Sequence, residues 1–148
     1  MKILLSIIFI SLLSFSSSGQ SEEPILITWK DLEDVEYEEV YVDSADVWFM
    51  RPVFSSSVLA LANKNIQIAG IYIDLEMEYT LLTRNSVKNL GKHNPLNNQL
   101  NEMIQLESFF PSNLENGEST GLSGILILND SNPYRLSFIL ENPEVVKK

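Results

Sequence analysis

The stretch that decides the fold is Ile66-Gln67-Ile68-Ala69-Gly70-Ile71-Tyr72-Ile73-Asp74-Leu75, residues 66–75. Side chains in a β-strand alternate between two faces. Here the first face carries Ile66, Ile68 and Tyr72, and the second carries Ala69, Ile71, Ile73 and Leu75. A glycine inside a strand often marks a bulge or a sharp bend, so Gly70 predicts that this strand is bent in its middle.

Further strands are predicted after this one. Residues 77–83 follow closely enough to be its hairpin partner. Residues 122–128 and 136–140 are two more apolar runs, and the segment between them, Asn-Asp-Ser-Asn-Pro at residues 129–133, is a strong turn signal. The last two strands are therefore expected to be neighbours joined by a loop.

Two short helices are predicted between the strands. The serine run at residues 55–57 can cap a helix that continues through residue 62. Asn94 and Pro95 are a plausible helix start, because proline is favoured at the first helical position. One apolar helical face then follows, made of Leu96, Leu100, Met103 and Ile104. The chain is expected to return to a strand over residues 105–110.

The elements together predict a fold that is mainly β, with one or two short helices. Residues 35–42 alternate in part and are interpreted as a strand, and residues 25–29 are either a strand or an anchoring arm. Five or six short strands with a mid-strand glycine favour a small, curved antiparallel barrel of the OB-like type over a flat sandwich. Residues 25–148 are expected to form this single domain, after a polar leader at residues 20–24.

The first nineteen residues have the order of a secretory signal peptide. A positive start at Lys2 is followed by a nearly continuous apolar run, residues 3–13, and then by small polar residues that end at Gly19. The apolar run has about 11 residues, whereas a helix needs about 20 to span a bilayer. We expect cleavage after Gly19, export to the periplasm or the exterior, and no membrane span afterwards.

Composition excludes several kinds of protein. The chain has 148 residues, a net charge of −10 and no cysteine. Disulfide scaffolds and thiolate metal or redox sites are therefore impossible. Nucleic acid is not expected as a partner, because phosphate binding needs clustered basic residues. Removal of residues 1–19 takes away one lysine and no acid, so the net charge of the mature chain is −11.

The acidic residues are concentrated near the N-terminus. Residues 22–46 contain ten acids and a single base, Lys30. Two interpretations are open. The stretch is either a negative face for a basic partner or for cations, or charge that keeps the chain soluble and protects an edge strand from aggregation.

Several motifs are spread over most of the mature chain. They are Ile27-Thr28-Trp29-Lys30-Asp31-Leu32, Trp-Phe-x-x-Pro-x-Phe-x-x-Ser-Val from Trp48 to Val58, Ile66-x-Ile68-x-Gly70-x-Tyr72-Ile73, Gly121-x-x-Gly124-x-Leu126-x-Leu128-Asn129, and Leu136-x-Phe138-Ile139-Leu140. They resemble an uncharacterised bacterial family, a domain of unknown function found as small exported OB-like barrels. Members of that family carry a cysteine pair after the second hairpin strand. Residues 83–88 have no cysteine here, so the resemblance implies the fold and no metal or redox site.

Two kinds of chemistry remain as alternatives. A hydrolase would need Ser123 as nucleophile, His93 as the base, since it is the only histidine, and a carboxylate. The segment around Ser123 has Ile125 where a nucleophile elbow would close with glycine, so a plain strand start is the simpler interpretation. A divalent-cation site is the other alternative. Its ligands would be Asp74, Glu76 and Glu78, although charge around a solvated hairpin bend explains the same spacing.

Non-catalytic binding is the function that the sequence favours. Trp48, Phe49 and Phe54 form either part of the core or the lining of a ligand groove, and Arg51 between them could stack on a ring or bind an anion. Arg84 and His93 lie in or beside a polar connection, residues 84–94, that a partner could contact. We therefore predict an exported binding or accessory module of the cell envelope. Its partner would be an envelope protein or a small ligand, no cofactor is expected, and the oligomeric state is open.

Overall fold

The structure is a computed structural model that describes residues 23–75, 79–85, 100–108 and 113–146. It is mainly β, as predicted. The elements in chain order are β1 Ile25–Leu26, the 3₁₀ helix η1 Trp29–Leu32, β2 Val35–Val42, β3 Val47–Phe54, α1 Ser56–Leu59, β4 Asn65–Asp74, β5 Thr80–Thr83, the 3₁₀ helix η3 Leu100–Glu102, β6 Met103–Glu107, β7 Ser119–Leu128 and β8 Phe138–Val145.

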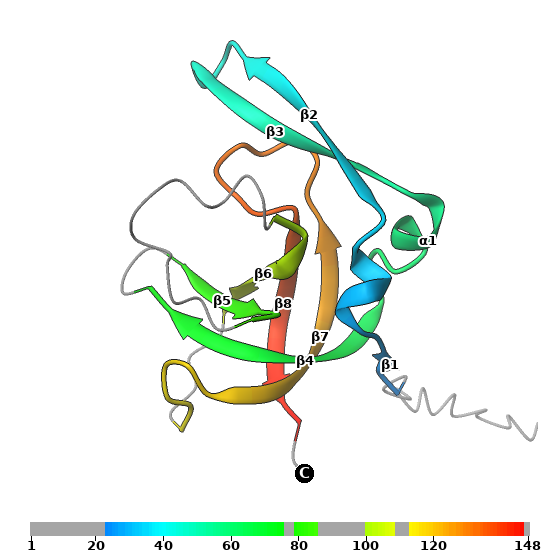
Figure 1. Cartoon of the computed structure of the whole chain (residues 1–148), viewed down its shortest axis with the longest axis vertical. Helices are drawn as coiled ribbons and strands as arrows, with labels where there is room; N and C mark the ends of the chain where they lie inside the picture. The colour runs from blue at the N-terminus through cyan, green and yellow to red at the C-terminus, as the bar shows by residue number, and fades with distance from the viewer. Residues whose placement is uncertain (1–22, 76–78, 86–99, 109–112, 147–148) are drawn as a thin grey trace, which may run out of the picture.

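Five of these strands close into a small barrel, shown in the lower part of Figure 1. Their order around it is β4-β5-β6-β8-β7, and β7 pairs with β4 to complete the ring. The predicted small, curved barrel is confirmed. One pair, β6 with β8, is parallel, which a wholly antiparallel barrel would not contain. Parallel neighbours need a long crossover connection, and here that connection contains β7.

Strand β4 lies in the barrel wall between β5 and β7, and it has the two faces that its sequence predicts. Ile66, Ile68 and Tyr72 are buried in the core. At Gly70 the neighbouring strand comes so close that an added Cβ would lie 2.7 Å from the carbonyl oxygen of Thr83. The β4–β7 register runs through Gly70 without a shift. The glycine is thus explained by close approach of the backbone, and the predicted bulge is absent from that ladder.

Residues 25–29, predicted as either a strand or an anchoring arm, begin as a short strand. β1 adds two residues in parallel to the edge of β4. The chain then turns into η1, where the Asp31 carboxylate accepts a hydrogen bond of 2.7 Å from the backbone N–H of Thr28. This capping interaction lowers the pKa of Asp31, because it favours the ionised carboxylate. η1 in turn places Trp29 and Leu32 in the core.

Strands β2 and β3 form a hairpin outside the barrel, which we call the arm. The two strands pair along their whole length, from Val35 with Phe54 to Val42 with Val47, and share no strand ladder with the barrel. Figure 1 shows the arm crossing above the barrel. The aromatic cluster predicted as core is divided: Phe49 is buried, but Trp48 is 67% exposed. A two-stranded ribbon cannot bury both faces, so core packing of all three aromatic residues was wrong.

The helix predictions were right at one place and wrong at another. Ser55 caps α1 as predicted, although the helix ends at Leu59 rather than at residue 62. The second predicted helix begins in residues 94–99, which lie outside the described part. Its end is not an α-helix, because Met103 and Ile104 begin β6 and pair with Thr83 and Leu82 of β5. Both side chains are buried in this ladder, although their spacing also fits the apolar face of a helix.

The C-terminal strands are longer than predicted. β7 begins at Ser119, and β8 continues through Val145, past the predicted end at residue 140. The register between them shifts opposite Ser123–Ile125, and Asn142 has a positive φ of 46° at this irregularity. The bulge lets a strand that contains Asn142 and a proline remain paired. No helix in the described residues is long and apolar enough to span a membrane.

Candidate functional site

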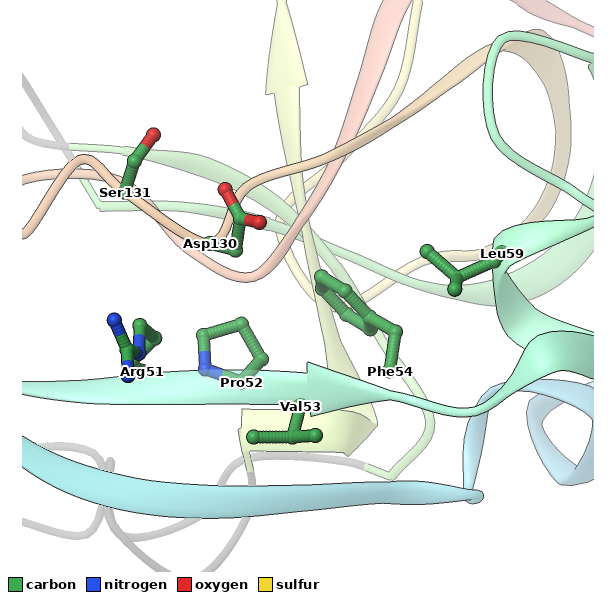
Figure 2. A pocket seen from close by; sticks show the side chains of 7 residues that line it. All are labelled: Arg51, Pro52, Val53, Phe54, Leu59, Asp130 and Ser131. Atoms are coloured by element: carbon green, nitrogen blue, oxygen red, sulfur yellow. The ribbon is translucent and has the colours of Figure 1, made fainter.

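A groove of about 430 Å³ lies between β3 of the arm and the loop 129–137 that joins β7 to β8. Figure 2 shows the loop above β3, with Asp130 and Ser131 on the loop side of the gap. The lining consists of four consecutive residues of β3, one residue of α1 and two of the loop: Arg51, Pro52, Val53, Phe54, Leu59, Asp130 and Ser131. Two elements far apart in the sequence thus meet at one concave surface.

The buried side chain of Asn129 organises the loop wall of the groove. The Asn129 side-chain nitrogen donates to the carbonyl oxygens of Asn132 and Arg135, at 2.9 and 3.1 Å. Its side-chain oxygen accepts from the backbone N–H of Asn132 at 2.9 Å. These bonds satisfy backbone groups that a loop leaves unpaired. The predicted turn signal at residues 129–133 is therefore a structured loop that presents Asp130 and Ser131.

The strand wall of the groove is fixed to the core at one end. The ring of Phe54 packs against Phe138 of β8, with ring centroids 5.6 Å apart. Directly afterwards Ser55 caps α1, which carries Leu59 to the mouth of the groove. Leu59 is 53% exposed and Val53 is 49% exposed. This end of the groove is accordingly apolar and open to solvent.

Two further contacts tie the arm to the loop. The Tyr134 hydroxyl donates a hydrogen bond of 3.4 Å to the carbonyl oxygen of Ala45, in the turn of the arm. Nearer the barrel, the hydroxyl of Tyr37 is buried, and burial raises its pKa, while the side chain of Ser137 lowers it to a smaller extent. No hydrogen bond of ordinary geometry reaches that hydroxyl. These contacts, together with Phe54, hold the two walls at their distance.

The two charged residues that line the groove, Arg51 and Asp130, differ in whether they form an ion pair. Arg51 forms an ion pair with Glu38, its cross-strand neighbour on β2, and its Nε lies 2.7 Å from the carboxylate oxygen. Its positive charge is therefore already matched. No ion pair among the described residues involves the exposed Asp130. The uncompensated charge in the lining of the groove is negative.

Of the four predicted binding residues, the three that the structure describes do not share one site. Arg51 lines the groove, whereas Trp48 lies outside the lining and contacts Tyr41, with ring centroids 5.2 Å apart. Arg84 forms ion pairs with Glu33 and, at 3.7 Å, with Glu102. His93 lies outside the described residues. A binding role for these four residues stays a prediction.

Five lining residues were not predicted from the sequence as binding residues, namely Pro52, Val53, Leu59, Asp130 and Ser131. Asp130 and Ser131 belong to the turn signal, whose density of loop-forming residues was the only hint of a surface loop there. Leu59 was assigned to a helix without a function. Nothing local in either segment indicates that the two segments meet.

The predicted cation ligands can be placed only in part. Asp74 ends β4, where its backbone carbonyl accepts a hydrogen bond of 3.0 Å from the side chain of Asn116. Glu76 and Glu78 lie outside the described residues. Within the described ranges, no group of three histidine, aspartate or glutamate side chains is arranged to hold a metal ion.

The hydrolase alternative depends on a residue that cannot be placed. Ser123 lies inside β7, in register with Gln67 of β4 and Glu144 of β8. A nucleophile needs a base within hydrogen-bonding reach, and His93 is outside the described part of the chain. Ser123 thus has the position expected of an ordinary strand residue, as the simpler interpretation proposed.

Comparison with known proteins identifies the fold alone. No protein-family model matches the sequence, and no curated protein matches it either. The structure is similar to the crystal structure of a DUF3299 family protein from Pseudomonas aeruginosa PAO1. The TM-score is 0.51, with 10% sequence identity over 85% of this chain and 98% of that chain. The resemblance to a domain of unknown function is supported to that extent; the cysteine pair and the OB-like type are not tested by it.

Proposed function

We propose that the protein is an exported, non-catalytic binding module that holds its ligand in the groove between β3 and the loop 129–137. The observation that carries this proposal is the construction of the groove. One wall is a loop organised by Asn129, and the other is a strand anchored in the core by Phe54. A concave surface with an apolar part and a few fixed polar groups is the usual form of a binding site.

An exposed side chain at the groove supports the same proposal. Leu59 is a large apolar residue that leaves about half of its surface in water beside the groove. Covering it would remove apolar area from water, which stabilises a complex by roughly 25 cal/mol for each Å² buried. The signal peptide predicted at residues 1–19 supports a location outside the cytoplasm, where the ligand would be an envelope protein or a small molecule.

Site-specific photocrosslinking tests this proposal. A photoreactive phenylalanine analogue replaces Leu59 at the mouth of the groove, and the chain is mixed with envelope extract and irradiated. The matched control carries the analogue at Ser119, which is also exposed. Ser119 begins β7, whereas the groove loop follows the other end of that strand, about 30 Å away at 3.3 Å per residue.

We expect discrete crosslinked products from the Leu59 position that the Ser119 position does not give. Asn129→Ala, which releases the loop wall, should reduce those products. The proposal is wrong if both positions give the same products, or if the Leu59 position gives none.

A further inference from the structure

We propose that the ligand is a peptide segment that carries a basic side chain beside an apolar one. The basic side chain would pair with Asp130, and the apolar side chain would pack against Phe54 and Leu59. This inference rests on the proposed function and specifies its ligand. Four observations carry it: the charge of the groove, the position of its apolar end, the proline in β3 and the charge of the arm.

The charge of the groove selects a cation. Each of the three described arginines already pairs with a glutamate: Arg51 with Glu38, Arg84 with Glu33 and Arg135 with Glu107. Asp130 has no such partner in the described part of the chain, and it lines the groove on the side of the loop. A ligand anion would meet this carboxylate, while its attraction to Arg51 would compete with Glu38. A ligand cation has no competitor at Asp130 among the residues that the structure describes.

The apolar end of the groove lies beside the charged part, along the same strand. In Figure 2, Phe54 points from β3 toward the loop, Leu59 lies beyond it, and Asp130 stands above Pro52. The order of the lining is therefore apolar at Phe54 and Leu59, acidic at Asp130, and polar at Arg51 and Ser131. A ligand with adjacent basic and apolar groups matches this order, and a peptide supplies such groups on neighbouring residues.

Pro52 decides how the peptide is held. β3 pairs with β2 on one edge, and its other edge has no strand partner among the described residues. A proline inside a strand takes a position whose nitrogen faces the free edge, where it offers no N–H. An added strand would lose a ladder hydrogen bond in the middle of the groove. Recognition therefore falls on the side chains of the ligand rather than on strand addition.

The arm surrounds the groove with negative charge. Its outer strand β2 exposes Glu36, Glu38 and Glu39, and residues 22–46 hold ten acids against one base. A field of one sign raises the association rate of a ligand of opposite sign and weakens as salt is added. Of the two interpretations of the acidic stretch, the proposal therefore favours the first, a negative surface that attracts basic segments.

Calorimetric titration of the purified chain with three model hexapeptides tests the inference. The first peptide alternates leucine and lysine between glycine ends, the second replaces lysine with glutamate, and the third replaces leucine with serine. We expect measurable binding of the first alone, weaker at 300 mM than at 50 mM salt. Asp130→Asn should weaken that binding about fivefold, the upper end for one exposed ion pair, and Leu59→Ser should weaken it as well.

Asp43→Asn is the matched control, because it removes the same charge from an exposed position in the turn of the arm. It should change the affinity less than twofold. Equal weakening by both variants would mean that only the overall field acts, and the inference would be wrong. Equal binding of the lysine and glutamate peptides would also overturn it. If none of the peptides binds while Leu59 still gives specific crosslinks, the ligand class is wrong and the proposed function stands. If Leu59 gives no crosslink, the proposed function fails.

Discussion

The indole Nε1 of Trp29 donates a hydrogen bond of 2.7 Å to the backbone carbonyl oxygen of Ala69, forty residues further along the chain. This bond fixes η1 against β4 at the residue before Gly70. An added Cβ at Gly70 would lie 3.1 Å from the ring of Trp29, as well as within 2.8 Å of Thr83 and Leu82. Both the N-terminal segment and β5 therefore pack against one short stretch of β4.

Gly70→Ala should destabilise the barrel by about 2 kcal/mol, because the methyl group would overlap the backbone of β5 and the space cannot open without moving the strand. Chemical denaturation measures the free energy of unfolding. Gly121→Ala is the control, since the nearest atom to its added Cβ is 3.7 Å away. Equal loss in both variants would show that the general cost of replacing glycine, rather than close packing, explains the effect.

The two tryptophans should be separable by fluorescence quenching. Trp29 is buried with its N–H bonded, while Trp48 is 67% exposed on the arm. We expect Trp48→Phe to leave a blue-shifted emission that acrylamide quenches weakly, and Trp29→Phe to leave a red-shifted emission that it quenches strongly. Trp48→Phe should change the unfolding free energy by less than about 1 kcal/mol. Strong protection of Trp48 would contradict its exposed position.

Asn129→Ala should destabilise the chain by about 2 kcal/mol and loosen the loop 129–137. The substitution removes the hydrogen-bond partner of the Asn132 and Arg135 carbonyl groups and of the Asn132 N–H. Limited proteolysis of the native chain should then cut within this loop. Ser131→Ala is the comparison, because that side chain lines the groove and the Asn129 bonds remain. Equal protease resistance of the two variants would show that Asn129 does not organise the loop.

Tyr37→Phe should leave the stability at pH 7 unchanged or increase it by up to about 1 kcal/mol. The buried hydroxyl has no hydrogen bond of ordinary geometry, so removing it relieves a desolvation cost. Burial raises the pKa of Tyr37 above its ordinary value of 10.0, so the folded state holds the proton more tightly than the unfolded state. Its contribution to stability is thus complete below pH 10 and is lost as the pH rises through the folded pKa.

Denaturation of the wild-type chain and of Tyr37→Phe at pH 7 and at pH 10.5 tests the direction of this pH dependence. The wild-type chain should lose more stability between the two pH values than Tyr37→Phe does. An equal loss would mean that Tyr37 ionises freely in the folded protein, and hence that its hydroxyl is not buried between the arm and the rest of the chain.

The barrel strands could be predicted because their patterns are local. Ile66, Ile68 and Tyr72 alternate on one face, and Ser55 is an ordinary helix cap. Met103 and Ile104 were misassigned because two adjacent apolar residues fit a helical face as well as a strand. Pairing with Thr83 and Leu82, a tertiary contact, decided between them.

The groove could not be predicted in the same way. Arg51 was recognised from its aromatic neighbours, but Asp130 comes from a loop that the sequence places far from β3. The two walls meet only because the arm folds back over the end of β7. The exposure of Trp48 has a similar origin, since the composition of the arm does not state that it forms a two-stranded ribbon beside the barrel.

The separation of the arm from the barrel ladder also has a consequence for motion. Because β2 and β3 share no strand pairing with the other strands, the arm can lift by breaking side-chain contacts while every barrel hydrogen bond stays intact. Such local opening requires less free energy than global unfolding, so amides of the arm should exchange with solvent before those of β4 and β7. A ligand that bridges β3 and Asp130 would favour the closed form by mass action. The groove then exists in an open and a closed form, and the ligand shifts the equilibrium toward the closed form.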